Sequence, residues 1–147
     1  NMRELFERLL AGILAGAGAG AHEQAIRVEN RSEPVVLKVE TAIPCALIVN
    51  ELVTNAFKHA FPDRSTGGEI ILEMRRTAAG PVEIRVCDNG CGMPGGVMPA
   101  AENTLGLKLV HILARQLRGN IELATGAGTC LGITFPPEEA PPVAPAG

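Results

Sequence analysis

Residues 50 to 62 read Asn50-Glu51-Leu52-Val53-Thr54-Asn55-Ala56-Phe57-Lys58-His59-Ala60-Phe61-Pro62. They close a longer segment, Thr41 to Phe61, in which apolar residues recur at helical spacing. Thr41 is available as a cap, Pro44 is tolerated in the first turn, and Pro62 ends the segment. We therefore expect the central helix of the fold here.

One side of this helix is polar. Glu51, Asn55 and Lys58 recur at intervals of three or four residues, so they share a face. A carboxylate, a carboxamide and an ammonium in register suit a hydrated divalent cation and the phosphates that it bridges, because hard cations prefer oxygen ligands. Mg²⁺ is the natural candidate. A solvent-facing stripe is the alternative, and the helix taken alone favours it.

Helices and strands are expected on both sides of the central helix. Before it, the patterns predict an amphipathic helix from Arg3 to Leu14 and a hairpin of two strands, Ala25 to Glu29 and Val35 to Val39. After it, they predict strands at Glu69 to Arg75 and Val82 to Asp88, a helix at Leu105 to Leu117, and strands at Asn120 to Ala124 and Cys130 to Phe135. This order favours an α+β fold, a two-layer α/β sandwich whose mixed sheet is covered on one face by three helices.

A long irregular segment separates the second and third of these helices. Cys91 to Thr104 is rich in Gly and Pro and too long for a simple turn, so we expect a lid. It follows Asp88-Asn89-Gly90-Cys91-Gly92, where a carboxylate can project from a strand end and the glycines let backbone approach a ligand closely. A plain Asp-Asn-Gly turn is the alternative.

Two further elements complete the set of candidate ligand-binding motifs. Thr104-Leu105-Gly106-Leu107 stands at the entry to a helix, and Gly128-Thr129 opens the last strand. A helix start with a flexible Gly can present backbone N–H groups to an anion, and the Thr129 hydroxyl can bind the same group as the aspartate. Each motif is also compatible with an ordinary cap or turn.

Length, composition and charge limit the kinds of function that this chain can have. The chain has 147 residues, 46% of them hydrophobic, which fits one domain. We expect that domain over residues 1–136 and a flexible Pro-rich tail over 137–147. A net charge of -3 without a Lys/Arg block argues against nucleic acid as a partner. The longest apolar stretch, Leu9 to Ala21, is too short to span a bilayer, so we expect no direct membrane contact.

The four cysteines are scattered at positions 45, 87, 91 and 130. Their spacing does not match common structural zinc sites. We expect reduced thiols packed as small hydrophobes, which is consistent with a cytoplasmic location.

The motifs together resemble those of a known family. The stretch Asn50 to Pro62 resembles the N box of sensor histidine kinases, in the branch where it reads Asn-Glu-Leu-x-x-Asn-Ala and closes on Phe-Pro. Asp88 to Gly92 resembles the first glycine box, Thr104 to Leu107 the second, and Gly128 to Pro136 the closing strand. Four motifs in the right order are far more specific than one. The resemblance implies the ATPase fold shared with gyrase, mismatch-repair ATPases and an ATP-dependent chaperone.

The resemblance also implies a role for each candidate residue, with ATP and Mg²⁺ between the long helix and the lid. Asn55 would ligate Mg²⁺, and Glu51 would polarise the attacking group, which makes these two the catalytic candidates. Asp88 would bind the adenine amino group with support from Thr129. The remaining nucleotide contacts would come from Lys58, His59, Gly90, Gly92, Leu105 and Gly106.

By the same resemblance, the γ-phosphoryl of ATP would pass to a histidine and then to an aspartate of a response regulator receiver domain. None of His22, His59 and His111 lies on a plausible acceptor helix. We therefore expect the acceptor on a separate, His-bearing dimerisation domain, and no autophosphorylation by this chain alone. Two alternatives remain: an anti-sigma-factor-type serine kinase of the same fold, and a non-catalytic nucleotide-gated interaction module, which the single glycine of the second box keeps open.

Overall fold

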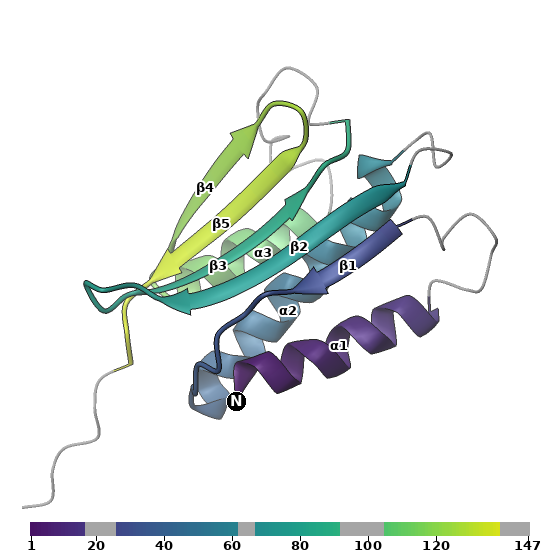
Figure 1. Cartoon of the computed structure of the whole chain (residues 1–147). Coiled ribbons are helices and arrows are strands. Elements are labelled where there is room, and N and C mark those ends of the chain that lie inside the picture. Colours follow the sequence, from purple (N-terminus) through teal and green to yellow (C-terminus); the bar gives the residue numbers. More distant parts are fainter. Residues whose placement is uncertain (17–25, 62–66, 92–104, 139–147) are drawn as a thin grey trace, which may run out of the picture.

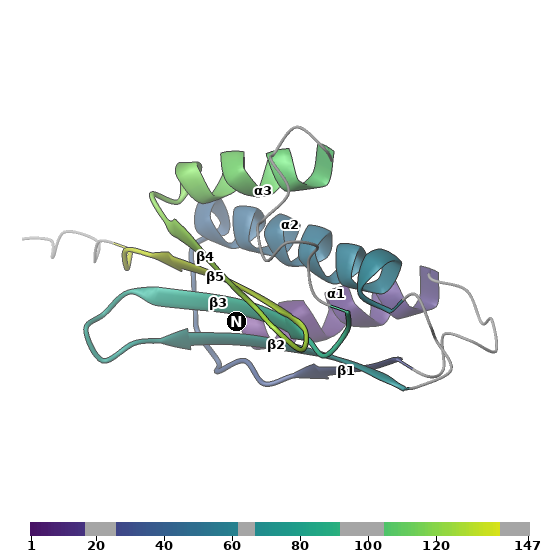
Figure 2. The same cartoon turned by 90° about the horizontal axis from the view of Figure 1, so that it is seen from above.

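The computed structural model describes residues 1–16, 26–61, 67–91 and 105–138. The helices are α1 (Met2–Gly16), α2 (Val39–Asn55) and α3 (Leu105–Gln116), and a π-helical turn, η2 (Ala56–Ala60), continues α2. The strands are β1 (Ile26–Asn30), β2 (Gly68–Arg76), β3 (Val82–Asp88), β4 (Asn120–Thr125) and β5 (Thr129–Phe135). The helices lie on one face of the sheet (Figures 1 and 2), which confirms the expected two-layer sandwich.

The described strands form one mixed sheet in the order β1-β2-β3-β5-β4. β1 runs parallel to β2, and the other neighbouring pairs are antiparallel. β3 is the middle strand, so the residues at its end lie between the start of β2 and the start of β5.

Side-chain alternation separates the two faces of the sheet. On β3, Val82, Ile84 and Val86 are buried under the helices, whereas the residues between them are only partly buried. β5 follows the same pattern, with Leu131, Ile133 and Phe135 buried. We call the face that the helices leave uncovered the open face.

α2 is the central helix of the helical layer. It lies between α1 and α3 and packs against both (Figure 2). Ile48, Val49, Leu52 and Val53 of α2 are all buried, which fits its nearly continuous apolar sequence. None of the helices in the described ranges combines the length and the apolar character that crossing a bilayer takes.

The expected hairpin before α2 is wrong. β1 pairs with β2, with Ile26 opposite Gly68, and residues 31–38 contain no strand. The polar segment after β1 does not turn back. It continues along β2, where the backbone N–H groups of Arg31 and Glu33 donate to the carbonyls of Leu72 and Met74, both at 2.8 Å. The next N–H in this alternation, that of Val35, donates to the Glu33 carbonyl at 2.8 Å instead, so the pairing with β2 ends there.

The start of α2 also differs from the expectation. The helix begins at Val39 with Lys38 in the capping position, so Thr41 lies inside the first turn and is not the cap. The backbone N–H of Lys38 donates to Glu138 Oε1 at 2.9 Å. A side chain 100 residues away in the sequence therefore reaches the start of the helix, which local sequence does not reveal.

Candidate functional site

The polar side of the central helix falls on two consecutive elements. Glu51 and Asn55 lie on the last turns of α2 and are half-buried. Lys58 and His59 lie on η2 and are exposed. The carboxylate of Glu51 and the carboxamide of Asn55 are thus partly shielded from solvent. Lys58 and His59 follow in the exposed turn η2.

Gly106 brings the start of α3 against this polar side. A Cβ placed on Gly106 would overlap Glu51 Oε2 and would lie 3.8 Å from Asn55 Nδ2. The first turn of an α-helix carries N–H groups that have no partner within the helix. Glu51, Asn55 and Gly106 therefore form one group, the helix cluster, in which a carboxylate and a carboxamide lie next to a helix N-terminus.

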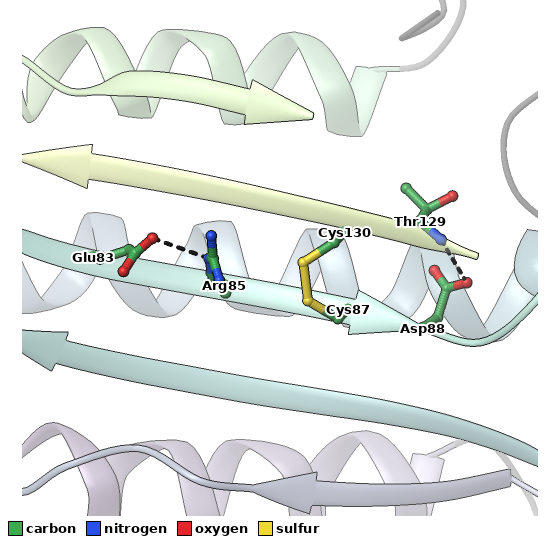
Figure 3. The surroundings of a disulfide bond; sticks show 6 residues. All are labelled: Glu83, Arg85, Cys87, Asp88, Thr129 and Cys130. Atoms are coloured by element: carbon green, nitrogen blue, oxygen red, sulfur yellow. Dashed lines mark hydrogen bonds and ion pairs between the residues drawn. A yellow bond between two sulfur atoms is a disulfide. The ribbon is translucent and has the colours of Figure 1, made fainter. Parts of the chain in front are cut away.

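Asp88 is the centre of a second group at the end of β3. Its Oδ1 accepts a hydrogen bond from the backbone N–H of Gly90 at 2.9 Å. The same oxygen accepts from the backbone N–H of Thr129 at 3.3 Å, a bond that Figure 3 shows. Both bonds use the same oxygen, so the carboxylate is held in one orientation. By the alternation along β3 and β5, Asp88 and Thr129 fall on the helix-covered side. We call Asp88, Gly90 and Thr129 the base cluster, after the adenine base that the sequence motifs lead us to expect there.

Two close backbone approaches fix the base cluster in place. A Cβ on Gly128 would overlap the carbonyl of Asp88, and a Cβ on Gly90 would overlap the carbonyl of Ala60. The backbone N–H of Cys91 donates to that same Ala60 carbonyl at 2.8 Å. Ala60 ends η2, the element that follows Asn55. The last turn of the central helix therefore connects the helix cluster to the base cluster.

Asn89 has a structural role that the sequence did not reveal. Its Oδ1 accepts from the backbone N–H of Glu69 at 2.7 Å, and its own N–H donates to the Glu69 carbonyl at 3.2 Å. The loop after β3 is thereby attached to the start of β2. An Asn in a Gly-rich turn is the available signal, because its side chain commonly bonds nearby backbone, but the sequence does not identify the partner strand.

Some predicted site residues lie outside the described ranges. They include Gly92 and residues 92–104 of the lid expected over Cys91 to Thr104. Two other sequence expectations also fall outside these ranges: residues 139–147 of the Pro-rich tail, and His22, which was weighed only as a phosphoacceptor. Leu105, at the start of α3, is 84% exposed, so only its backbone is placed for a role beside the helix cluster. His111 lies on α3 and is half-buried.

The expectation of reduced thiols is wrong for two of the four cysteines. Cys87 and Cys130 are cross-strand neighbours on β3 and β5, with Cα atoms 4.0 Å apart, and a disulfide joins them (Figure 3). They are 43 residues apart in sequence, so spacing gave no sign of the pairing. Cys45 is buried and Cys91 is exposed. Burial, with a smaller contribution from the negative charge of Glu138, raises the pKa of the Cys45 thiol to about 12.

Comparison with known proteins identifies the class. Residues 40–139 match the family described as histidine kinase-, DNA gyrase B-, and HSP90-like ATPase, and the chain belongs to this family. Its similarity is to the kinases: it is 33% identical over 115 residues to blue-light-activated histidine kinase 2 of Erythrobacter litoralis (strain HTCC2594). It is 28% identical over 122 residues to the sensor histidine kinase PdtaS of Mycobacterium tuberculosis. Within the family, the chain is a histidine kinase-type ATP-binding domain.

A solved structure supports the same placement. The histidine kinase domain of the blue-light-activated kinase EL346 of Erythrobacter litoralis superposes with a TM-score of 0.79 at 29% identity. The match covers 92% of this chain and 60% of that one. The curated relatives are longer still: the matches cover 76% and 82% of this chain but only 32% and 24% of the relatives.

Proposed function

We propose that this chain is the catalytic ATP-binding domain of a two-component sensor histidine kinase. It binds ATP with Mg²⁺ and passes the γ-phosphoryl to a histidine on a separate dimerisation domain, from which a response regulator receiver domain takes it. The observation that supports this most is the connection, through Ala60, of the helix cluster to the base cluster. Such a connection suits a ligand with a base at one end and phosphates at the other.

The base cluster suits adenine. Asp88 uses Oδ1 for two backbone N–H groups, which leaves Oδ2 to accept a hydrogen bond from the adenine amino group. The hydroxyl of Thr129 contributes a second polar contact to the base. Because the carboxylate is already oriented, little ordering is needed when the base binds.

The helix cluster suits the phosphate end. Asn55 and Glu51 offer the oxygen ligands that Mg²⁺ prefers, so the residues present fit this ion, with Asn55 as its ligand. When bound, Mg²⁺ neutralises charge on the phosphates. Glu51 orients the attacking group, the N-terminus of α3 at Leu105 and Gly106 attracts negative charge, and Lys58 and His59 interact with the phosphates from η2.

This set of groups suits phosphoryl transfer, because in-line transfer depends on positioning and charge neutralisation more than on a covalent nucleophile. Since the reaction uses ATP, we place the domain in the cytoplasm. A serine kinase of the same fold would use the same nucleotide site, so the chemical nature of the phosphorylated product distinguishes the two.

Asn55→Ala tests the proposal at the phosphate end. The variant should bind ATP–Mg²⁺ about tenfold or more weakly, as expected for loss of a ligand to a charged group, and should bind adenosine unchanged. Asn120→Ala is the matched control, because Asn120 is exposed and pairs with Thr134, away from the Thr129 end of β5. Titration calorimetry with both ligands measures the difference. Equal losses for ATP and adenosine would contradict the role given to Asn55.

A further inference from the structure

The Cys87–Cys130 disulfide lies directly behind the base cluster. In the register of β3 and β5, Cys87 is opposite Cys130, and the next pair along the strands is Asp88 opposite Thr129. Successive side chains of a strand point to opposite faces. Asp88 and Thr129 therefore face the helices, whereas the two cysteines are on the open face with Glu83 and Arg85 (Figure 3).

This position leaves the disulfide accessible while the nucleotide site is occupied. Neither cysteine belongs to the buried core, and both are partly exposed. A ligand bound by Asp88 would be on the opposite side of the sheet. A small redox reagent can therefore reach the sulfur atoms without entering the nucleotide site.

The same position places the cysteine pair next to the strand ends that carry the base cluster. The backbone of the two strands is in close contact here, since a Cβ on Gly128 would overlap the Asp88 carbonyl. The 3.3 Å hydrogen bond from the Thr129 N–H to Asp88 Oδ1 joins the same strand ends. Two reduced thiols cannot come as close as two bonded sulfur atoms, so reduction requires the thiols to rotate apart or the strand ends to separate.

We propose that Cys87 and Cys130 form a redox modification site that controls how well the base cluster is organised for nucleotide. This inference rests on the proposed function. The oxidised pair holds Asp88 and Thr129 together, and the reduced pair lets them move apart. The reagent is a low-molecular-weight disulfide such as oxidised glutathione.

Thiol–disulfide exchange with the small disulfide needs no group from the protein other than these two thiols. One cysteine thiolate attacks the small disulfide, which forms a mixed disulfide and releases one small thiol. The second cysteine then displaces the other small thiol and closes the Cys87–Cys130 bond. Two protein thiols are oxidised, one small disulfide is reduced to two thiols, and the two protons end on those thiols.

The other two cysteines are separated from this chemistry. Cys45 is buried on α2, and its pKa of about 12 leaves almost no thiolate near neutral pH. Cys91 is exposed, so it is replaced in the test by Cys91→Ser to keep it out of the exchange.

The test uses the Cys91→Ser chain equilibrated in either oxidised or reduced glutathione. Intact mass shows whether two hydrogen atoms have been lost, and calorimetry gives the affinity for ATP–Mg²⁺. We expect the oxidised form to bind about three- to tenfold more tightly, because preorganisation of the site improves affinity. Adding Cys87→Ser and Cys130→Ser should give the reduced-form affinity in both buffers.

Hydrogen exchange at the amides of Gly90 and Thr129 supplies a second readout, and we expect slower exchange in the oxidised form. Failure of the disulfide to form in oxidised glutathione would overturn the inference. So would equal affinity and equal exchange in two forms that mass distinguishes. If neither form binds ATP, the proposed function fails, and amide exchange still decides whether the cysteine pair organises the base cluster.

Discussion

At the residue scale, the proposed recognition of adenine depends on which atom Asp88 presents to the ligand. Oδ1 is engaged by the N–H groups of Gly90 and Thr129. In Asp88→Asn, the amide oxygen would stay with those N–H groups, so the amide nitrogen would face the adenine amino group, donor against donor. We expect ATP affinity to fall about ten- to a hundredfold without loss of the fold, as for a mispaired polar group.

Glu83→Gln is the matched control for this change. It makes the same carboxylate-to-amide substitution on the same strand, but on the open face, where Glu83 pairs with Arg75 at 2.7 Å and Arg85 at 3.0 Å. The Glu83 side chain is only 12% exposed, so the substitution costs some stability, but it leaves the base cluster on the other face untouched. Titration calorimetry should give the control an ATP affinity close to that of the unmodified chain. An Asp88→Asn chain that binds equally well would remove Asp88 from the base site.

Several site residues could be predicted from sequence because local pattern determines their placement. Helical spacing placed Glu51 and Asn55 on one polar side, and a strand ending at Asp88 placed its carboxylate at a strand end. The hydrogen-bond partners of these residues are instead set by the pairing of strands that are distant in the sequence. The Thr129 bond to Asp88 spans 41 residues. The disulfide and the hydrogen bonds between Asn89 and Glu69 also join distant segments, so no local sequence motif predicts them.

At the element scale, the turn between β4 and β5 sets how closely the two sides of the base cluster approach. A Cβ on Gly128 would meet the backbone of Asp88, which cannot move as a flexible side chain can. We expect Gly128→Ala to lower the free energy of unfolding by about 1–3 kcal/mol, as for overpacking, and to weaken ATP binding.

Gly126→Ala provides the control within the same turn. A Cβ on Gly126 would meet nothing within 4 Å, so thermal unfolding of this variant should match that of the unmodified chain. If Gly128→Ala were as stable as Gly126→Ala, the close approach at Asp88 would not be a constraint on the fold.

Helices and strands could be predicted where the apolar residues that recur at helical or strand spacing are the ones that become buried. The three helices and the strands β1 to β5 were expected close to their observed bounds, although β1 was given the wrong partner. The failure came at residues 31–38, whose apolar positions Val35 and Val36 suggested a strand. Val35 is buried and its carbonyl accepts from the N–H of Met2 at 2.8 Å, whereas Val36 is 69% exposed. Burial of Val35 in the core at the start of α1, rather than pairing in the sheet, accounts for its apolar character.

At the scale of the whole molecule, the nucleotide site and the phosphoacceptor are expected on different domains. The matches span 32% and 24% of the kinases' lengths, so much of each relative lies outside the compared region. Transfer between separate pieces should be slow and should depend on their concentrations, because a linker would otherwise raise the effective concentration of the acceptor toward millimolar.

Phosphoryl transfer from γ-labelled ATP–Mg²⁺ tests the central claim most directly. The chain is incubated with and without a separately supplied His-bearing dimerisation fragment of its kinase. We predict acid-labile label on the fragment, little on the chain alone, and a large decrease with Asp88→Asn or Asn55→Ala. Acid-labile label on the chain alone, or acid-stable label on a serine of an added antagonist protein, would contradict the assignment.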